Sequence, residues 1–204
     1  MKRIRVIILL YCNVAGAQHK KPLPAYLDVQ SAVFSLSMVM MHDVVNPPAA
    51  SRFYAYAMLG AYEIVSRQNK TVPALSTLLK SYTAGQAGTY NKQYDHRIAA
   101  VYCILETGKR MLPSGFMLEK QEEELIQKLK KNKISLSIID ESIAVANLVA
   151  GEIVAYAKAD GYGKLSAKLR YTPLKGDEYW YPTPPAYMEA VEPNWKTIRP
   201  MLID

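Results

Sequence analysis

Four charged or imidazole-bearing side chains in the first third of the chain have the types that chemistry needs. His42 and Asp43 are neighbours, and a histidine beside a carboxylate is a frequent general acid–base arrangement. Adjacent residues of a helix point about 100° apart, however, which favours a structural role for His42. Arg52 and Glu63 are eleven residues apart, so they share a helix face without touching. Because buried charges need partners, we expect each of them to pair with another helix.

Motifs for metals and phosphates do not stand out. The three histidines are far apart and have no Cys or His at zinc spacing. The sequence has neither a Gly-rich phosphate loop nor a nucleophile elbow. Asp95 precedes a helical stretch and fits a helix N-cap. The residues themselves therefore predict no metal site.

Residues 1–17 have the layout of a secretory signal peptide. Three cationic residues precede a short apolar run, and small residues at 15–17 offer a cleavage site after Ala17. The run is shorter than the roughly 20 residues of a transmembrane helix, so we expect no membrane span after signal removal and a periplasmic or secreted location. Loss of the three cations lowers the formal net charge from +7 to +4. Basic residues are not interleaved with stacking aromatics, so no nucleic-acid partner is predicted. The one cysteine left, Cys103, is expected to be a buried, inert thiol.

The spacing of apolar residues predicts an all-α fold of about six helices in a bundle. Asn46 and the two prolines after it suit the start of a helix. Glu-to-Lys pairs at helical spacing predict an amphipathic surface helix over residues 117–131. The other helices are expected from residue 28 to the Asn46 break, and over 47–67, 74–82, 95–111 and 135–159. The predicted organisation is a signal peptide (1–17), a linker (18–27), a helical domain (28–160) and an irregular arm (161–204).

The arm contains six prolines and loses helical periodicity. Structureless stretches longer than about 12–15 residues are uncommon in compact domains unless they serve a function. Four large aromatic residues in the arm are costly to leave in water: Trp180, Tyr181, Tyr187 and Trp195. We therefore expect the arm to lie along a surface, either of this helical core or of material outside it.

Two stretches resemble a known family. HDVVNPPAASRFYAYAMLGAYEIV (42–65) and WYPTPPAYMEAVEPNWKTIRPMLID (180–204) are similar to the N-terminal helical half and the following linker of secreted bacterial proteins related to vanadium-dependent haloperoxidases. These belong to the type 2 phosphatidic acid phosphatase superfamily. The resemblance implies a catalytic half after the linker. There, cationic side chains and backbone donors would hold phosphate or vanadate, and histidines would act as acceptor or ligand and as acid.

The family's catalytic motifs are not matched here. Pro113-Ser114-Gly115-Phe116 is similar to the Pro-Ser-Gly-His motif, but Phe116 replaces the imidazole. Lys196 and Arg199-Pro200 resemble a Lys…Arg-Pro motif, but two residues rather than six separate them, and position 192, where the lysine would fall, is Glu. We therefore carry over no catalytic residue. No cofactor is expected in this chain, and vanadate or phosphate would require the missing catalytic half.

We expect an accessory helical domain, inactive by itself, that docks through residues 47–67 and the arm. Its partner would be the missing catalytic half, a split-gene partner or another copy of the chain, and a fragment, a truncated gene product and a split subunit all stay open. The alternatives are a stand-alone exported helical binding module, with arm aromatics lining a ligand surface, and a self-contained phosphatase-like enzyme. The residues singled out for docking or structure are His42, Asp43, Arg52, Tyr56, Glu63, Trp180, Trp195 and Arg199.

Overall fold

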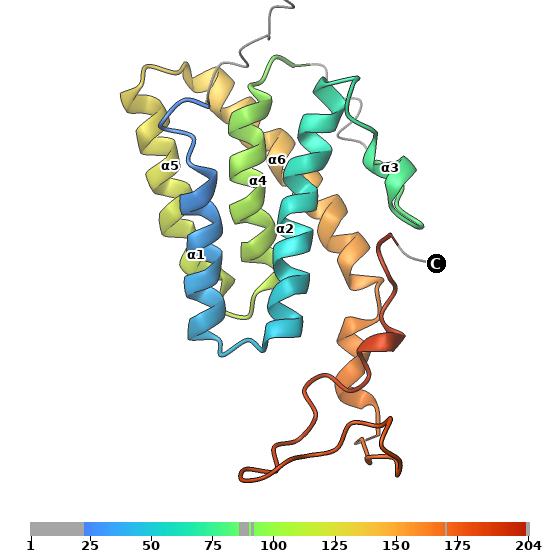
Figure 1. The fold of residues 1–204 in the computed structure, drawn as a ribbon. Coiled ribbons are helices and arrows are strands. Elements are labelled where there is room, and N and C mark those ends of the chain that lie inside the picture. The colour runs from blue at the N-terminus through green and yellow to red at the C-terminus, as the bar shows by residue number, and fades with distance from the viewer. Residues whose placement is uncertain (1–22, 86–89, 91, 170, 203–204) are drawn as a thin grey trace, which may run out of the picture.

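The computed structural model describes residues 23–85, 90, 92–169 and 171–202. The predicted signal peptide and residues 18–22 of the predicted linker lie outside this part. The described part is all helical and has no strand, as the sequence predicts (Figure 1). Its elements are α1 (Val29–His42), α2 (Pro47–Gln68), α3 (Leu75–Leu78), α4 (His96–Met111), η2 (Gly115–Leu118), α5 (Glu119–Lys131), α6 (Leu136–Lys158), η3 (Tyr162–Ala167) and η4 (Trp195–Thr197).

Side-chain caps begin the four main helices. Asp28, Asn46, Asp95 and Ser135 each accept a hydrogen bond from a backbone N–H in the first turn of α1, α2, α4 and α6, respectively. The helix predicted over 74–82 is shorter, because Leu79 is extended (ψ 132°) and turns into the core. The first two residues of the predicted helix 117–131 belong to the 3-10 helix η2.

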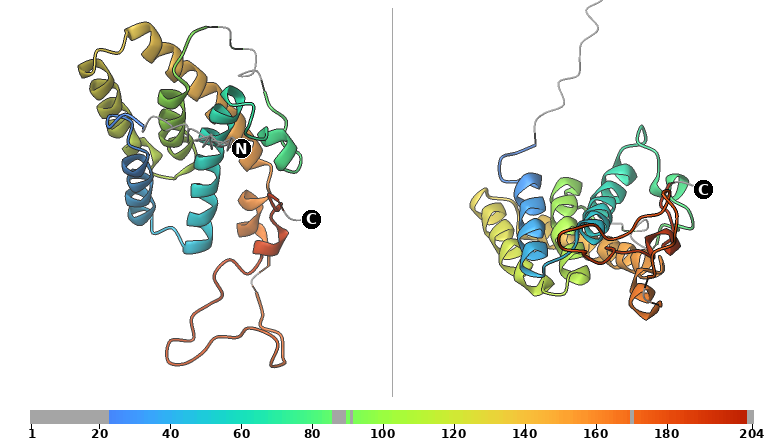
Figure 2. Two further views of the ribbon diagram at one scale, coloured as in Figure 1. Left: turned by 45° about the horizontal axis from the view of Figure 1, so that its top comes forward. Right: turned by 60° about the horizontal axis from the view of Figure 1, so that its bottom comes forward.

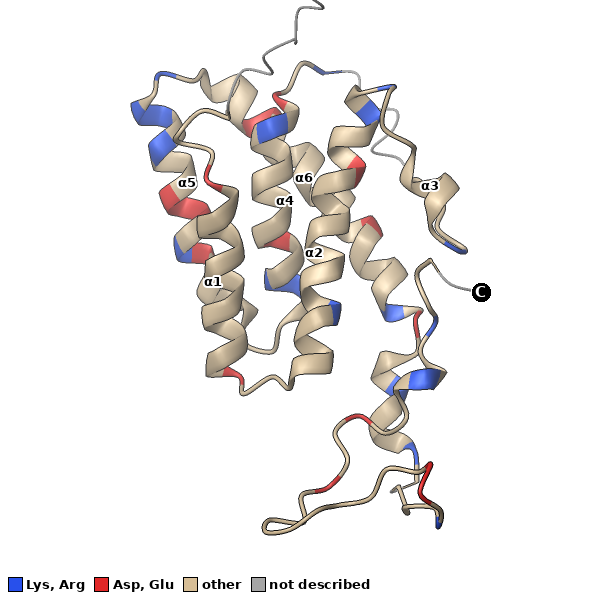
Figure 3. Cartoon of the chain, viewed as in Figure 1, with Lys and Arg blue, Asp and Glu red and all other residues tan. Residues whose placement is uncertain are grey.

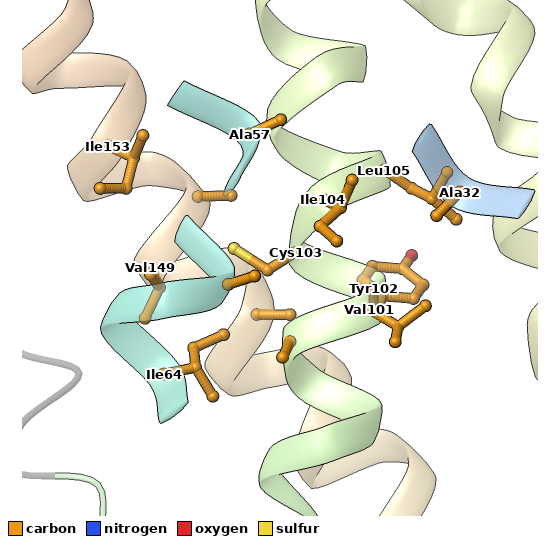
Figure 4. Packing of buried hydrophobic residues seen from close by; sticks show 14 of the residues in the cluster. Ala32, Ala57, Ile64, Val101, Tyr102, Cys103, Ile104, Leu105, Val149 and Ile153 are labelled. Carbon is orange, nitrogen blue, oxygen red and sulfur yellow. The ribbon is translucent and has the colours of Figure 1, made fainter. Parts of the chain in front are cut away.

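Helix α4 lies at the centre of the bundle and packs against α2 on one side and α6 on another (Figures 1 and 2). Every residue from 98 to 108 is buried, so α4 is covered on all sides. Figure 4 shows Cys103 of α4 facing Ala57 and Ile64 of α2 and Val149 of α6. Cys103 is fully buried, which confirms the predicted environment, and burial raises the pKa of its thiol to about 12.

A glycine allows α2 to approach α4 closely. A Cβ atom added to Gly60 would lie 2.8 Å from the Cys103 sulfur and 3.2 Å from the Thr107 hydroxyl. Such distances leave no room for a side chain without movement of the neighbours. This contact therefore sets the spacing of the two helices, and with it the position of the residues that α2 presents to the arm.

The C-terminal arm leaves α6 through a left-handed turn at Gly161 (φ 95°). It makes a long excursion away from the bundle and returns to the C-terminal part of α6 at η4 (Figures 1 and 2). Three of its aromatic residues are not covered by the helical core, so the surface predicted for them would have to lie outside this core. Trp180, Tyr181 and Tyr187 are 49%, 58% and 62% exposed, because the excursion carries them off the bundle, and only Trp195 is brought back.

Helix α1 contains no Lys, Arg, Asp or Glu (Figure 3). Its inner side packs on α4 and η2. Its outer side exposes Phe34, Met38 and Met41, at 64%, 47% and 71%. Among the described residues, no helix combines the length and apolar character of a membrane span.

Candidate functional site at the arm–bundle junction

Asp160 joins three parts of the chain just after the end of α6. Its Oδ2 atom accepts hydrogen bonds from Arg52 Nε (2.6 Å) and the Tyr56 hydroxyl (3.0 Å), both on α2. Its Oδ1 atom accepts the backbone N–H of Tyr162 (2.8 Å). The carbonyl of Asp160 accepts the N–H of Arg199 from the returning arm (2.9 Å). The carboxylate side chain is 1% exposed, so its charge depends on these partners.

The guanidinium of Arg52 also caps the C-terminus of α6. Its Nη2 atom donates to the Ala157 carbonyl (2.9 Å), where the free carbonyls of a helix carry partial negative charge. The central guanidinium carbon lies 4.5 Å from the ring centroid of Tyr162, 5.0 Å from that of Tyr56 and 5.8 Å from that of Phe53. These distances fall within the cation–π range. Three aromatic rings therefore surround a buried cation.

Arg199 attaches the arm to α6. Its guanidinium carbon lies 3.7 Å from the Tyr156 ring centroid, and its Nη2 atom donates to the Tyr156 carbonyl (2.8 Å). Its Nε atom is buried and has no hydrogen-bond partner among the described residues. Within the same residues no carboxylate pairs with Arg199, so its positive charge is not neutralised by an ion pair.

Glu192 fastens the arm to the start of α2. Its Oε1 atom accepts hydrogen bonds from the Asn46 amide (3.0 Å) and the Tyr162 hydroxyl (3.3 Å). The Tyr162 ring in turn makes an edge contact with Trp195, with centroids 6.1 Å apart. Burial and the Glu192 charge raise the pKa of Tyr162, and burial with a neighbouring carboxylate raises that of Tyr56. Both phenols therefore remain protonated donors at neutral pH.

A cavity of about 410 Å³ opens beside this network. Arg52, Lys196 and Arg199 line it as three cations, and among the described residues Asp160 is its one carboxylate, so the formal charge of this described lining is +2. The remaining walls are mostly apolar, from Ala55, Trp195, Ile198, Pro200 and Met201. The junction thus combines a clamp for the arm with a hollow that suits a negatively charged group.

His42 and Asp43 lie at the C-terminal end of α1, and neither belongs to the hydrogen-bond network around Asp160. The two side chains are in contact: His42 Nδ1 is 3.2 Å from Asp43 Oδ1, with Asp43 as the C-cap of α1 (φ −78°, ψ 0°). Asp43 Oδ2 accepts the backbone N–H of Ser114 (3.0 Å). Burial alone would raise the pKa of Asp43, but the hydrogen bonds from Ser114 and His42 lower it. The pair ties α1 to the turn before η2.

Glu63 belongs to a second buried cluster farther along α2. Its Oε1 atom accepts from Arg67 Nε (2.9 Å), and Arg67 Nη2 also lies 3.1 Å from Glu152 Oε2 on α6. Burial and the charges of Glu63 and Glu152 raise the pKa of the nearby Tyr82. Arg52 and Glu63 therefore share α2 but take part in separate clusters between α2 and α6.

Trp180 lies in the excursion of the arm. Its carbonyl accepts the Tyr171 hydroxyl (3.3 Å), and the two rings have centroids 6.2 Å apart. Together with η3 they line a cavity of about 620 Å³. Of the residues singled out from the sequence, the fold brings Arg52, Tyr56, Trp195 and Arg199 to the junction. It leaves His42, Asp43, Glu63 and Trp180 elsewhere.

Sequence reasoning missed Asp160, the centre of the junction. One signal was available: an aspartate at the C-terminal end of a helix faces the negative end of the helix dipole and is unfavourable without a cation nearby. Asp160 comes right after Ala159, the C-cap of α6, and this position would have pointed to an arginine partner. Among the described residues, no three His, Cys, Asp or Glu side chains form a group that could hold a metal ion.

Comparisons with known proteins give one informative result. No protein-family model matches the chain, and no curated protein matches it. A solved structure, described as that of the first bacterial vanadium-dependent iodoperoxidase, is similar over 90% of this chain, with a TM-score of 0.72 and 29% sequence identity. The chain spans 43% of the iodoperoxidase chain. It therefore has a fold like that of a vanadium haloperoxidase over somewhat less than half of such a protein.

Proposed function

We propose that this chain is the accessory helical half of a haloperoxidase- or phosphatase-like protein. In this proposal it docks against a catalytic half, which supplies the oxyanion-binding cations and the acid–base histidines. One observation carries the proposal: nearly the whole of this chain is similar to 43% of a vanadium-dependent iodoperoxidase.

The exposed aromatic residues of the arm support docking. Besides Trp180, Tyr181 and Tyr187, the arm exposes Met188 and Val191 at 71% and 55%. Several large apolar side chains exposed on one segment favour a protein interaction site over an ordinary solvated loop. The uncharged outer side of α1 adds a second apolar surface. The junction at Asp160 would hold both ends of the excursion, so that its aromatic residues are presented to the partner.

The docking proposal is tested on purified residues 18–204. We expect self-association and binding of an apolar dye. The double variant Tyr181→Ser/Met188→Ser should reduce both, because it removes exposed apolar area from the arm. Leu136→Ser is the matched control, since Leu136 is 60% exposed at the start of α6. A monodisperse, cooperatively melting monomer that binds no dye would show that docking is unnecessary.

The proposal also predicts that the chain by itself has no catalytic activity. Purified protein is assayed for phosphatase activity and halide oxidation, each with and without vanadate. We expect no turnover above a buffer control. Activity that persists through purification and is abolished by His42→Ala would instead favour a self-contained enzyme.

A further inference from the structure

We infer that the cavity at the arm–bundle junction binds an organic carboxylate, with the carboxylate group on Arg52, Arg199 and Lys196 and its apolar part against Trp195. This inference goes beyond docking to a catalytic half. It rests on the unused donors, the excess positive charge and the apolar walls of the same cavity.

Arg52 and Arg199 each have a guanidinium N–H group that makes no hydrogen bond within the described residues. Arg52 uses Nε and Nη2 for Asp160 and Ala157, and Arg199 uses Nη2 for Tyr156. The Nη1 atom of each has no hydrogen-bond partner among the described residues, and neither Nη1 is sealed from solvent. Both residues line the cavity. Guanidinium groups with free N–H donors bind carboxylates and phosphates in preference to neutral groups.

The charge balance of the cavity favours an anion. Asp160 offsets one of the three cations, and its carboxylate is already engaged by Arg52, Tyr56 and a backbone N–H. A bound monoanion would lower the remaining formal charge from +2 to +1. Burial strengthens such an interaction compared with the same contact in bulk water.

The apolar walls of the cavity favour an organic anion over an inorganic one. Ala55, Ile198, Pro200 and Met201 present apolar surface around the cations, and Trp195 adds an aromatic side chain. An inorganic dianion would leave these walls in contact with its hydration water, whereas an organic carboxylate covers them. The volume of about 410 Å³ lies in the usual range of small-molecule sites.

Trp195 provides the readout for a test. The chain contains two tryptophans, so Trp180→Phe leaves Trp195 as the only indole. The full Trp180→Phe chain is titrated at constant ionic strength with hexanoate, acetate and inorganic phosphate, with Trp195 fluorescence and calorimetry as signals. We expect a saturable response to hexanoate at lower concentration than to acetate or phosphate.

Two variants in this background test the site. Lys196 is exposed and makes no ion pair among the described residues, so Lys196→Gln should leave the fold intact while weakening hexanoate binding about two- to fivefold, the range for an exposed ion pair. Arg97→Gln, which removes a cation at the start of α4, is the matched control and should bind like the parent. Three results would overturn the inference. They are equal hexanoate affinities of Lys196→Gln and Arg97→Gln, a higher affinity for phosphate than for hexanoate, and no saturable response to hexanoate. These outcomes are independent of dye binding by the arm, so they separate the cavity from docking.

Discussion

Arg52 on α2 and Asp160 after α6 are 108 positions apart, and their side chains meet at 2.6 Å with both buried. This pair holds the end of α6 against the start of α2. It also places the Asp160 carbonyl where the returning arm can donate to it. The arm, the longest helix and α2 are therefore fastened at one point.

Breaking this pair should destabilise the fold strongly. Arg52→Met leaves the Asp160 carboxylate buried with two donors instead of three, and we expect a loss of about 3–5 kcal/mol in the free energy of unfolding. Urea denaturation followed by circular dichroism measures it. Arg97→Met is the control, because Arg97 pairs with Asp95 at 42% side-chain exposure and exposed pairs contribute roughly 0–1 kcal/mol. Equal losses in the two variants would contradict a special role for the buried pair.

Releasing the arm should be separable from unfolding the bundle. Arg199→Met keeps an apolar stem on Tyr156 but removes the hydrogen bond of the guanidinium to the Tyr156 carbonyl. We expect faster limited proteolysis within residues 171–194. The free energy that opposes detachment of the arm should fall by about 1.5–3 kcal/mol, the range for one hydrogen bond to a charged group. Lys175→Met, in the excursion itself, is the matched control. An unchanged cleavage rate in Arg199→Met would show that the arm is held by other contacts.

The close approach of α2 and α4 should make Gly60 sensitive to a single methyl group. Gly60→Ala places a Cβ atom 2.8 Å from the Cys103 sulfur in the fully buried core. We expect destabilisation of about 1–3 kcal/mol from overpacking, in spite of the higher helix propensity of alanine. In Gly163→Ala the new methyl group meets nothing within 4 Å. Thermal unfolding of both variants tests the packing, and a stabilised Gly60→Ala protein would contradict it.

A carboxylate pair between α4 and α5 should make stability depend on pH. Lys109 Nζ lies 2.6 Å from a carboxylate oxygen of Glu106 and of Glu122. Burial raises the pKa of Glu122, Lys109 lowers it, and Glu106 raises it again, to about 7. Between the usual value of 4.5 and about 7 the folded state binds more protons than the unfolded state, so stability falls as pH rises through this interval.

The variant Glu122→Gln removes this titration. We expect a flatter dependence of the unfolding free energy on pH in that interval, measured by urea denaturation at several pH values. Burial alone would raise the pKa of Glu106, but hydrogen bonds, that of Lys109 first, lower it. The stability that ionised Glu106 contributes to the fold is therefore lost only at lower pH, as the pH falls through its lowered pKa. Glu123→Gln, on the exposed side of α5, is the control, and an equal slope in the parent and in Glu122→Gln would refute the assignment.

The helices could be predicted from the sequence because their signals are local. Apolar spacing and the predicted caps Asn46 and Asp95 act within a few residues of the chain. The length of α3 could not be predicted in this way, since Leu79 leaves the helix to reach the core. The burial of Cys103 followed from its apolar helical surroundings.

The candidate site depended on contacts that no local signal specifies. The sequence by itself determined the helical class, the starts of the main helices and the proline-rich, irregular character of the arm. It marked Arg52 as a charge that needs a partner, but gave no distance to any carboxylate. Only the tertiary structure decided that Asp160 is that partner, that Arg199 binds α6 beside it, and that Trp180 stays exposed while Trp195 is partly buried at the junction. The physical reason is that periodicity and capping are properties of neighbouring residues, whereas pairing of buried charges is set by how whole helices pack.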